Sequence, residues 1–121
     1  MSKKILIVDD SESIREIVSF TLENAGHDVI KAIDGQDALK FLNGDKFDLI
    51  ITDLHMPNMN GIELIKKIRE SEPYKFTPIL FLTTESQTEK KMEAKKAGAT
   101  GWIVKPFMPA KLLEAINKVT R

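Results

Sequence analysis

The chain has no cysteine, a single tryptophan, a single tyrosine and no net charge. Without cysteine, a disulfide framework and every thiolate metal site are excluded. Acidic and basic residues number 18 each, so no summed field attracts nucleic acid or an anionic membrane surface. The apolar run after Lys4 is only four residues long, which is too short for a signal peptide or a membrane span. We therefore expect a soluble cytoplasmic protein that binds neither nucleic acid nor membrane.

Short β-branched runs alternate with helical patterns along the whole chain. Its 121 residues suffice for one hydrophobic core, so we expect a single domain over residues 1–121. The alternation predicts parallel strands joined by right-handed crossovers, and strands that are apolar at consecutive positions predict helices on both faces. The pattern indicates an α/β fold, a doubly wound three-layer sandwich around a five-stranded parallel sheet. Predicted strands are 4–8, 28–32, 48–52, 78–83 and 102–105; a helix between Ser11 and Gly26 is followed by helices 36–42, 61–70, 88–97 and 109–119.

Acidic side chains follow two of the predicted strands. Asp9 and Asp10 end the first strand, and Asp53 ends the third. If these strands are neighbours, as in the flavodoxin-like order 2-1-3-4-5, the three carboxylates meet at the carboxyl edge of the sheet. Their repulsion raises pKa values unless a cation intervenes, and Mg²⁺ with several retained waters is the simplest candidate. Taken singly, each aspartate is equally typical of a helix cap or turn.

A hydroxyl and an ammonium share this rim, because Thr83 ends the fourth strand and Lys105 the fifth. Either one alone is more typical of an ordinary strand end. Combined with a metal, they form a receptacle for a phosphoryl group, whose transfer depends mainly on positioning and charge neutralisation. A carboxylate can be the nucleophile in such a transfer. Asp53 is the best candidate because the turn that follows projects it outward, and we interpret it as the residue that becomes phosphorylated.

Four segments carry a family resemblance: VDDS at 8–11, TDLHMPNMNG at 52–61, LTTE at 82–85 and AGATGWIVKPF at 97–107. In this order and spacing they are highly specific, although any one alone is weak. On these segments the chain resembles the receiver domain of two-component response regulators over essentially its whole length. Within that family it is most similar to the stand-alone chemotaxis regulators of the CheY type.

The resemblance implies a role for each residue of the site. Asp53 is expected to accept a phosphoryl group from the phosphohistidine of a CheA-like histidine kinase. Asp10, Asp53 and the main-chain carbonyl of His55 are expected to hold Mg²⁺. Asp9 is expected to act through metal-bound water. Lys105 is expected to pair with the phosphoryl group after transfer.

The resemblance also implies a switch. The Thr83 hydroxyl is expected to close on the phosphoryl group and to vacate space for an aromatic side chain, which here is Trp102. The indole is larger than the usual tyrosine or phenylalanine, and its N–H is a polar handle. The peptide bond before Pro106 is expected to be cis. His55 and Glu85 occupy positions that tune the lifetime of the phosphoryl group in this family.

Output is expected through a face formed by helix 88–97, strand 102–105 and helix 109–119. No DNA-binding or catalytic region follows the last helix, so we expect a monomer that acts by contact with a downstream protein such as a flagellar motor switch protein. We expect no enzymatic activity beyond its own phosphorylation and dephosphorylation. A single-domain receiver in a phosphorelay outside chemotaxis is the alternative.

Two further functions share some of these features. A small Mg²⁺-dependent aspartyl-phosphate phosphatase of the haloacid dehalogenase kind also combines aspartate, threonine and lysine. That family has a DxD signature and acidic metal ligands after the lysine, whereas this chain has VDDSES and nothing acidic between Lys105 and Glu114. A flavodoxin-like carrier of FMN needs a phosphate loop after the first strand, where an acidic doublet repels phosphate.

Overall fold

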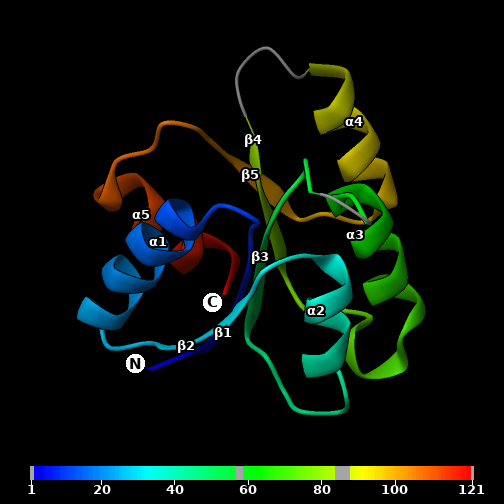
Figure 1. Ribbon diagram of the computed structural model, residues 1–121, viewed down its shortest axis with the longest axis horizontal. Helices are drawn as coiled ribbons and strands as arrows, with labels where there is room; N and C mark the ends of the chain where they lie inside the picture. Colours follow the sequence, from blue (N-terminus) through cyan, green and yellow to red (C-terminus); the bar gives the residue numbers. More distant parts are fainter. Residues whose placement is uncertain (1, 57–58, 84–87, 121) are drawn as a thin grey trace.

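The computed structural model describes residues 2–56, 59–83 and 88–120, and it contains one parallel five-stranded sheet (Figure 1). The strand order β2-β1-β3-β4-β5 confirms the predicted doubly wound fold. Across those ranges, no helix has both the length and the apolar composition needed to cross a bilayer. The strands are β1 (Lys4–Val8), β2 (Asp28–Ala32), β3 (Leu49–Asp53), β4 (Ile79–Thr83) and β5 (Gly101–Val104). The helices are α1 (Glu12–Asn24), α2 (Gly35–Phe41), α3 (Gly61–Glu70), the 3₁₀ turn η1 (Glu72–Tyr74), α4 (Thr88–Ala97) and α5 (Pro109–Val119).

Small shifts at strand ends separate the predicted elements from the observed ones. β3 runs one residue further than predicted because Asp53 still pairs with Leu82 of β4 in the ladder. β5 ends at Val104, so Lys105 lies just beyond the strand. The 3₁₀ turn η1 was not predicted. It places Pro73 in the first turn of a helix, where a missing N–H costs little.

Side-chain caps set where the helices begin. Ser11, Asp34 and Asn60 precede α1, α2 and α3, and each accepts a hydrogen bond from a main-chain N–H in the first turn of its helix. Gly26 and Gly98 follow α1 and α4 with φ of 91° and 121°, the left-handed conformation in which glycine ends helices. These caps place the start of α1 directly after β1 and the start of α3 a short loop after β3, both at the carboxyl edge of the sheet.

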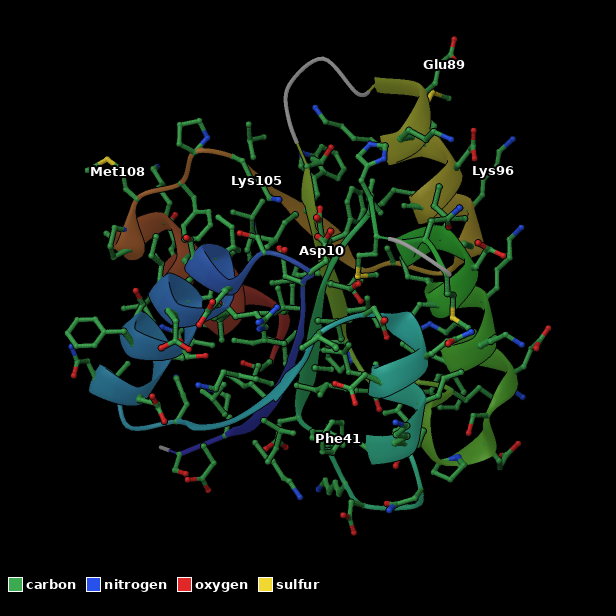
Figure 2. The ribbon with its side chains drawn as sticks, viewed as in Figure 1. Asp10, Phe41, Glu89, Lys96, Lys105 and Met108 are labelled. Carbon is green, nitrogen blue, oxygen red and sulfur yellow. The ribbon has the colours of Figure 1, made fainter. Side chains whose placement is uncertain are left out.

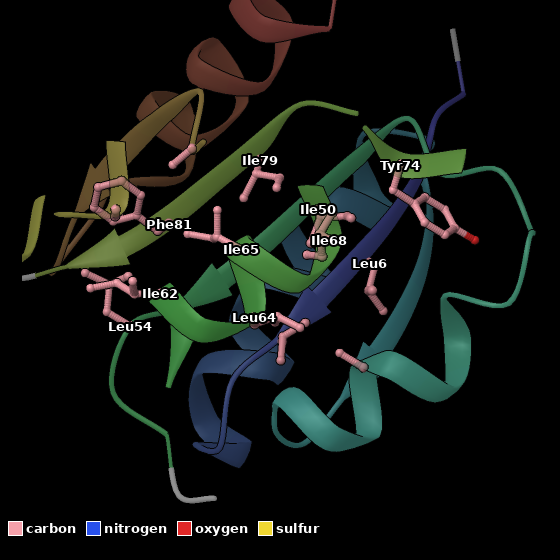
Figure 3. Packing of buried hydrophobic residues seen from close by; sticks show 14 of the residues in the cluster. Leu6, Ile50, Leu54, Ile62, Leu64, Ile65, Ile68, Tyr74, Ile79 and Phe81 are labelled. Carbon is pink, nitrogen blue, oxygen red and sulfur yellow. The ribbon is translucent and has the colours of Figure 1, made fainter. Parts of the chain in front are cut away.

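Helices cover both faces of the sheet, as the apolar strands predicted. In β1, Leu6 and Val8 belong to the cluster under α2, α3 and α4, whereas Ile5 and Ile7 belong to the cluster under α1 and α5. Figure 3 shows the first cluster between α3 and the strands. Because β1 and β3 are buried on both faces, polar groups at their carboxyl ends lie at the border of the core, and Asp9 and Asp53 are themselves buried.

One arginine ties three chain segments together at the other end of α3. The Nε of Arg69 donates to the carbonyl oxygen of Gly98 at 3.0 Å, and Nη1 donates to the carbonyl oxygens of Tyr74 at 3.0 Å and Thr77 at 2.7 Å. A Cβ on Gly98 would lie 2.7 Å from Cγ of Arg69. The end of α3, the segment before β4 and the turn after α4 are therefore held by one guanidinium.

Candidate functional site

Three carboxylates meet at the carboxyl edge of the sheet. β1 and β3 are neighbours, with Val8 opposite Thr52, so the residues that follow them lie side by side. One carboxylate oxygen from each of Asp9, Asp10 and Asp53 lies within 4.8 Å of the other two. Asp9 is fully buried, Asp53 is 7% exposed, and Asp10 is open to solvent. The structure thus brings together the three acidic residues singled out from the sequence.

Lys105 reaches into this cluster from the end of β5, and Figure 2 shows Lys105 and Asp10 at the same end of the sheet. Its Nζ lies 3.3 Å from Oδ1 of Asp53 and 3.7 Å from Oδ2 of Asp9. Its main-chain N–H donates to the carbonyl oxygen of Thr83 at 2.6 Å. The Lys105–Pro106 bond is cis, as expected. One ammonium therefore lies near two of the three carboxylates, and the cluster keeps excess negative charge.

The charged form of the buried Asp9 carboxyl is disfavoured by its surroundings. Burial raises the pKa of its carboxyl above the ordinary value, and the nearby charges of Asp53 and Asp10 add to the rise, although the Ser11 N–H and Lys105 oppose it. Oδ1 accepts a hydrogen bond from that N–H at 2.9 Å. Oδ2 is buried and accepts no hydrogen bond within the described part of the chain. A buried acceptor without a donor is costly, and a hard cation with oxygen ligands relieves that cost, so the donor set fits Mg²⁺.

Replacing Asp9 with asparagine is expected to stabilise the fold at pH 7 in buffer containing a chelator. A carboxyl whose pKa is raised on folding costs stability as the pH rises from its ordinary value of 3.8 to the raised value, and the cost remains above it. Urea unfolding followed by circular dichroism, repeated from pH 3 to pH 8, measures the difference between Asp9→Asn and wild type. That difference should vanish at low pH.

The exposed Asp28→Asn variant is the control for this experiment, and its stability at pH 7 should match that of wild type. An Asp9→Asn variant that is less stable than wild type at pH 7 would contradict the argument.

Asp53 is held by hydrogen bonds from both of its neighbours in the chain. Its Oδ1 accepts a hydrogen bond from the N–H of Leu54 at 2.8 Å, and its main-chain oxygen accepts one from the Thr52 hydroxyl at 2.9 Å. The N–H of Gly61, the first residue of α3, donates to the carbonyl oxygen of Leu54 at 2.9 Å. A Cβ on Gly61 would overlap the main-chain oxygen of Asp53 and lie 2.8 Å from Cα of Leu54. The start of α3 therefore lies directly against the main chain at the end of β3.

Trp102 lies on the surface rather than inside the fold. Its side chain is 43% exposed and packs at 6.1 Å between ring centroids against Phe81, which is opposite it in β4. The Nζ atoms of Lys91 and Lys95 lie 5.7 and 5.8 Å from the indole centroid. Each such cation–π contact is worth about 0.5–1 kcal/mol at an exposed site. Two ammonium groups from α4 therefore favour the outward position of this ring.

The remaining predicted residues are placed as follows. Thr83 is the last residue of β4 and is 1% exposed. His55 and Pro106 are exposed in the loops that follow β3 and β5. Glu85 lies outside the described residues. The tuning roles of His55 and Glu85, the His55 carbonyl ligand and the switch roles of Thr83, Trp102 and Pro106 stay predictions.

Arg15 is a site neighbour that reasoning from the sequence missed. Its Nη1 donates to the main-chain oxygen of Asp9 at 2.7 Å. Side chains on a helix lean toward its amino terminus, so the fourth residue of α1 can reach back to the turn after β1. This lean, applied to an arginine one turn into a helix that follows an acidic doublet, is the signal that would have found it.

Comparison with known proteins decides the family. The sequence model of the family called response regulator receiver domain matches residues 5–117 of this chain. The chain belongs to this family. Its relatives include the chemotaxis protein CheY-3 of Vibrio cholerae, 44% identical over 96% of this chain and 90% of the relative, and CheY of Pseudomonas aeruginosa, 40% identical over 96% and 94%. The solved structure of the chemotaxis response regulator CheY4 of Vibrio cholerae is 52% identical, with a TM-score of 0.93 over 98% of this chain and 99% of that one. The protein is a receiver of the CheY type.

Proposed function

We propose that this receiver is a phosphorylation-activated signalling switch whose acceptor is Asp53. The observation that carries the proposal is the side-chain cluster itself, in which three carboxylate oxygens lie within 4.8 Å of one another and the Lys105 ammonium lies 3.3 Å from Asp53. Such a cluster has the parts that phosphoryl transfer requires, namely a carboxylate nucleophile, a cation site and a fixed positive charge. The donor is a phosphohistidine on a histidine kinase.

In the proposed transfer, a carboxylate oxygen of Asp53 forms a bond to phosphorus as the P–N bond to the histidine breaks, and the imidazole nitrogen keeps the electron pair. Asp10 and Asp53, with the His55 carbonyl, would hold Mg²⁺, which supplies neutralisation of the charge on the phosphoryl oxygens. Asp9 contributes negative charge from the buried side of the cluster. Lys105 exchanges its contact with the Asp53 carboxylate for one with the new phosphoryl oxygens.

The signal is proposed to pass from Asp53 to Trp102 through a short series of side chains. The phosphoryl group adds a charge of about −1.5 to −2 and new acceptor oxygens, which draw in the Thr83 hydroxyl. Thr83 and Phe81 are two residues apart in β4 and so share a face of the sheet, and Phe81 packs against Trp102. A movement of Thr83 changes the space beside Phe81 and with it the preferred position of the indole. Pro106 holds the turn that presents Lys105.

The output is proposed to be chemotactic signalling, as the names of the relatives suggest, and the protein is proposed to act in the cytoplasm. Trp102 borders three grooves on the face formed by α4, β5 and α5, with volumes of about 430, 340 and 510 Å³. A change in the position of the Trp102 ring therefore changes the shape of all three grooves. A monomeric receiver would thereby alter its affinity for a downstream partner, for which a flagellar motor switch protein is the proposed candidate.

The proposal is tested by incubating the protein with phosphoramidate in the presence of Mg²⁺. Intact-mass spectrometry should show a gain of one phosphoryl group, which disappears when a chelator removes the metal. Sustained hydrolysis of phosphomonoesters without this adduct would instead indicate a phosphatase.

Trp102 fluorescence is expected to respond to beryllofluoride, a phosphoryl analogue, added together with Mg²⁺. The chain has one tryptophan, and its ring lies between Phe81 and two lysines, so any movement of the ring changes its contacts. The emission spectrum should change in intensity or wavelength. Beryllofluoride without Mg²⁺ is the control, and an unchanged spectrum with both present would count against the coupling.

A further inference from the structure

Arg15 reaches back from α1 to the main chain of the turn between β1 and α1, whereas Lys105 contacts the Asp9 carboxylate. The Nη1 of Arg15 donates to the main-chain oxygen of Asp9 at 2.7 Å, the distance of a charge-assisted hydrogen bond. The other bonds of the turn are local or part of the sheet edge. The N–H of Asp9 donates to Ala32 at 3.2 Å, and Oδ1 of Asp9 accepts from the N–H of Ser11 at 2.9 Å.

The bonded oxygen belongs to the peptide group that joins Asp9 to Asp10. A peptide group is planar, so fixing its oxygen fixes the plane and the position of the next Cα. The next residue is Asp10, whose exposed carboxylate is one of the three that converge. By holding this peptide group, Arg15 helps to fix where the Cα of Asp10 lies and so how its carboxylate can reach the other two.

We propose that Arg15 is a positioning residue for Mg²⁺ binding, which holds the Asp9–Asp10 peptide so that the Asp10 carboxylate faces Asp9 and Asp53. The inference rests on the proposed function. Groups that orient a metal ligand by hydrogen bonding typically weaken metal binding by 10- to 100-fold when they are removed. The half-buried Arg15 side chain has the same relation to the Asp10 ligand, acting through one peptide group instead of directly on the carboxylate.

The sign of the effect separates positioning from simple charge. Arg15 carries a positive charge beside a site for a divalent cation, so electrostatics alone predicts that removing it strengthens Mg²⁺ binding. Positioning predicts the opposite, because a freed peptide lets Asp10 swing out of the cluster. Arg15→Met keeps the apolar stem of the side chain and removes both the charge and the donor.

The experiment is a Mg²⁺ titration of the ¹⁵N-labelled full chain followed by NMR, without any phosphoryl donor. Arg15→Met is expected to bind Mg²⁺ about tenfold more weakly than wild type. Arg15→Lys, which retains the charge and one donor, should fall between the two. The control is Arg69→Met, which breaks four hydrogen bonds to main-chain oxygens at the carboxyl end of α3, so it should unfold at lower urea concentration yet bind Mg²⁺ as wild type does.

Arg15→Met binding that is unchanged or tighter overturns the inference, as does an Arg15→Lys variant weaker than Arg15→Met. Equal weakening in Arg69→Met also overturns it, because the loss would then follow general stability. If wild type itself shows no Mg²⁺-dependent shifts, the proposed function fails. If wild type binds and Arg15→Met binds equally well, only the positioning role fails.

Discussion

Replacing Asp53 with asparagine is expected to abolish the phosphoryl adduct completely. The amide is a neutral and poor nucleophile, so no acyl phosphate forms at this position. Asparagine has nearly the same shape and keeps an oxygen for the N–H of Leu54, which lies 2.8 Å from Oδ1 in wild type. The fold should therefore survive. Intact-mass spectrometry after incubation with phosphoramidate and Mg²⁺ measures the loss, and circular dichroism checks the fold.

Asp45→Asn is the matched control for this substitution. Asp45 is an exposed aspartate in the loop before β3, away from the carboxyl edge of the sheet. Its variant should form the adduct at the wild-type rate. A phosphoryl adduct of normal yield on Asp53→Asn would show that another residue of the cluster, Asp9 or Asp10, is the acceptor.

Replacing Gly61 with alanine is expected to destabilise the fold by about 3 kcal/mol, near the upper end of the usual cost of overpacking. The added Cβ would overlap the main-chain oxygen of Asp53 and approach Cα of Leu54 to 2.8 Å. These are main-chain atoms of the strand end and cannot swing aside as the tip of a side chain can. The preference of alanine for helices, at most about 1 kcal/mol over glycine, does not offset this overlap. Urea unfolding measures the loss.

Gly101→Ala is the comparison for that experiment. Its Cβ would lie 3.3 Å from Cδ2 of Leu80, a flexible side-chain terminus that can shift, so the expected loss is small. Gly61→Ala should also bind Mg²⁺ more weakly, because relief of the overlap moves Asp53. A variant that unfolds at the wild-type urea concentration would mean that α3 can retreat from the strand without cost.

The sheet order and the acidic cluster were predictable because they follow from local patterns and one topological rule. Strands that are apolar at successive positions require helices on both faces, and neighbouring β1 and β3 bring Asp9 and Asp53 to one edge. The end of β3 was misplaced by one residue, since a buried aspartate inside a strand looks like the start of a turn. The end of β3 is determined by the pairing of Asp53 with Leu82 of β4, which the local sequence pattern does not show.

Contacts that depend on distances in three dimensions were not predictable. The overlap expected at Gly61 arises from the angle at which α3 starts against β3, which no spacing of residues specifies. Arg69 appeared to be a basic residue near a helix end, and its four carbonyl partners come from segments before β4 and after α4. The contacts of Trp102 with Lys91 and Lys95 were not predictable for a similar reason, because the two lysines come from a different element.

The hydrogen bond from Arg69 to Gly98 affects how α4 can move during signalling. α4 begins near the carboxyl edge of the sheet, where phosphorylation is proposed to act, and it ends beside the carbonyl oxygen that Arg69 holds at 3.0 Å. A helix that is held at its carboxyl end moves most at its amino end. Any tilt of α4 should therefore pivot about Gly98, so that Lys91 travels further from the indole of Trp102 than Lys95 does. The two cations would then leave the ring in sequence rather than together.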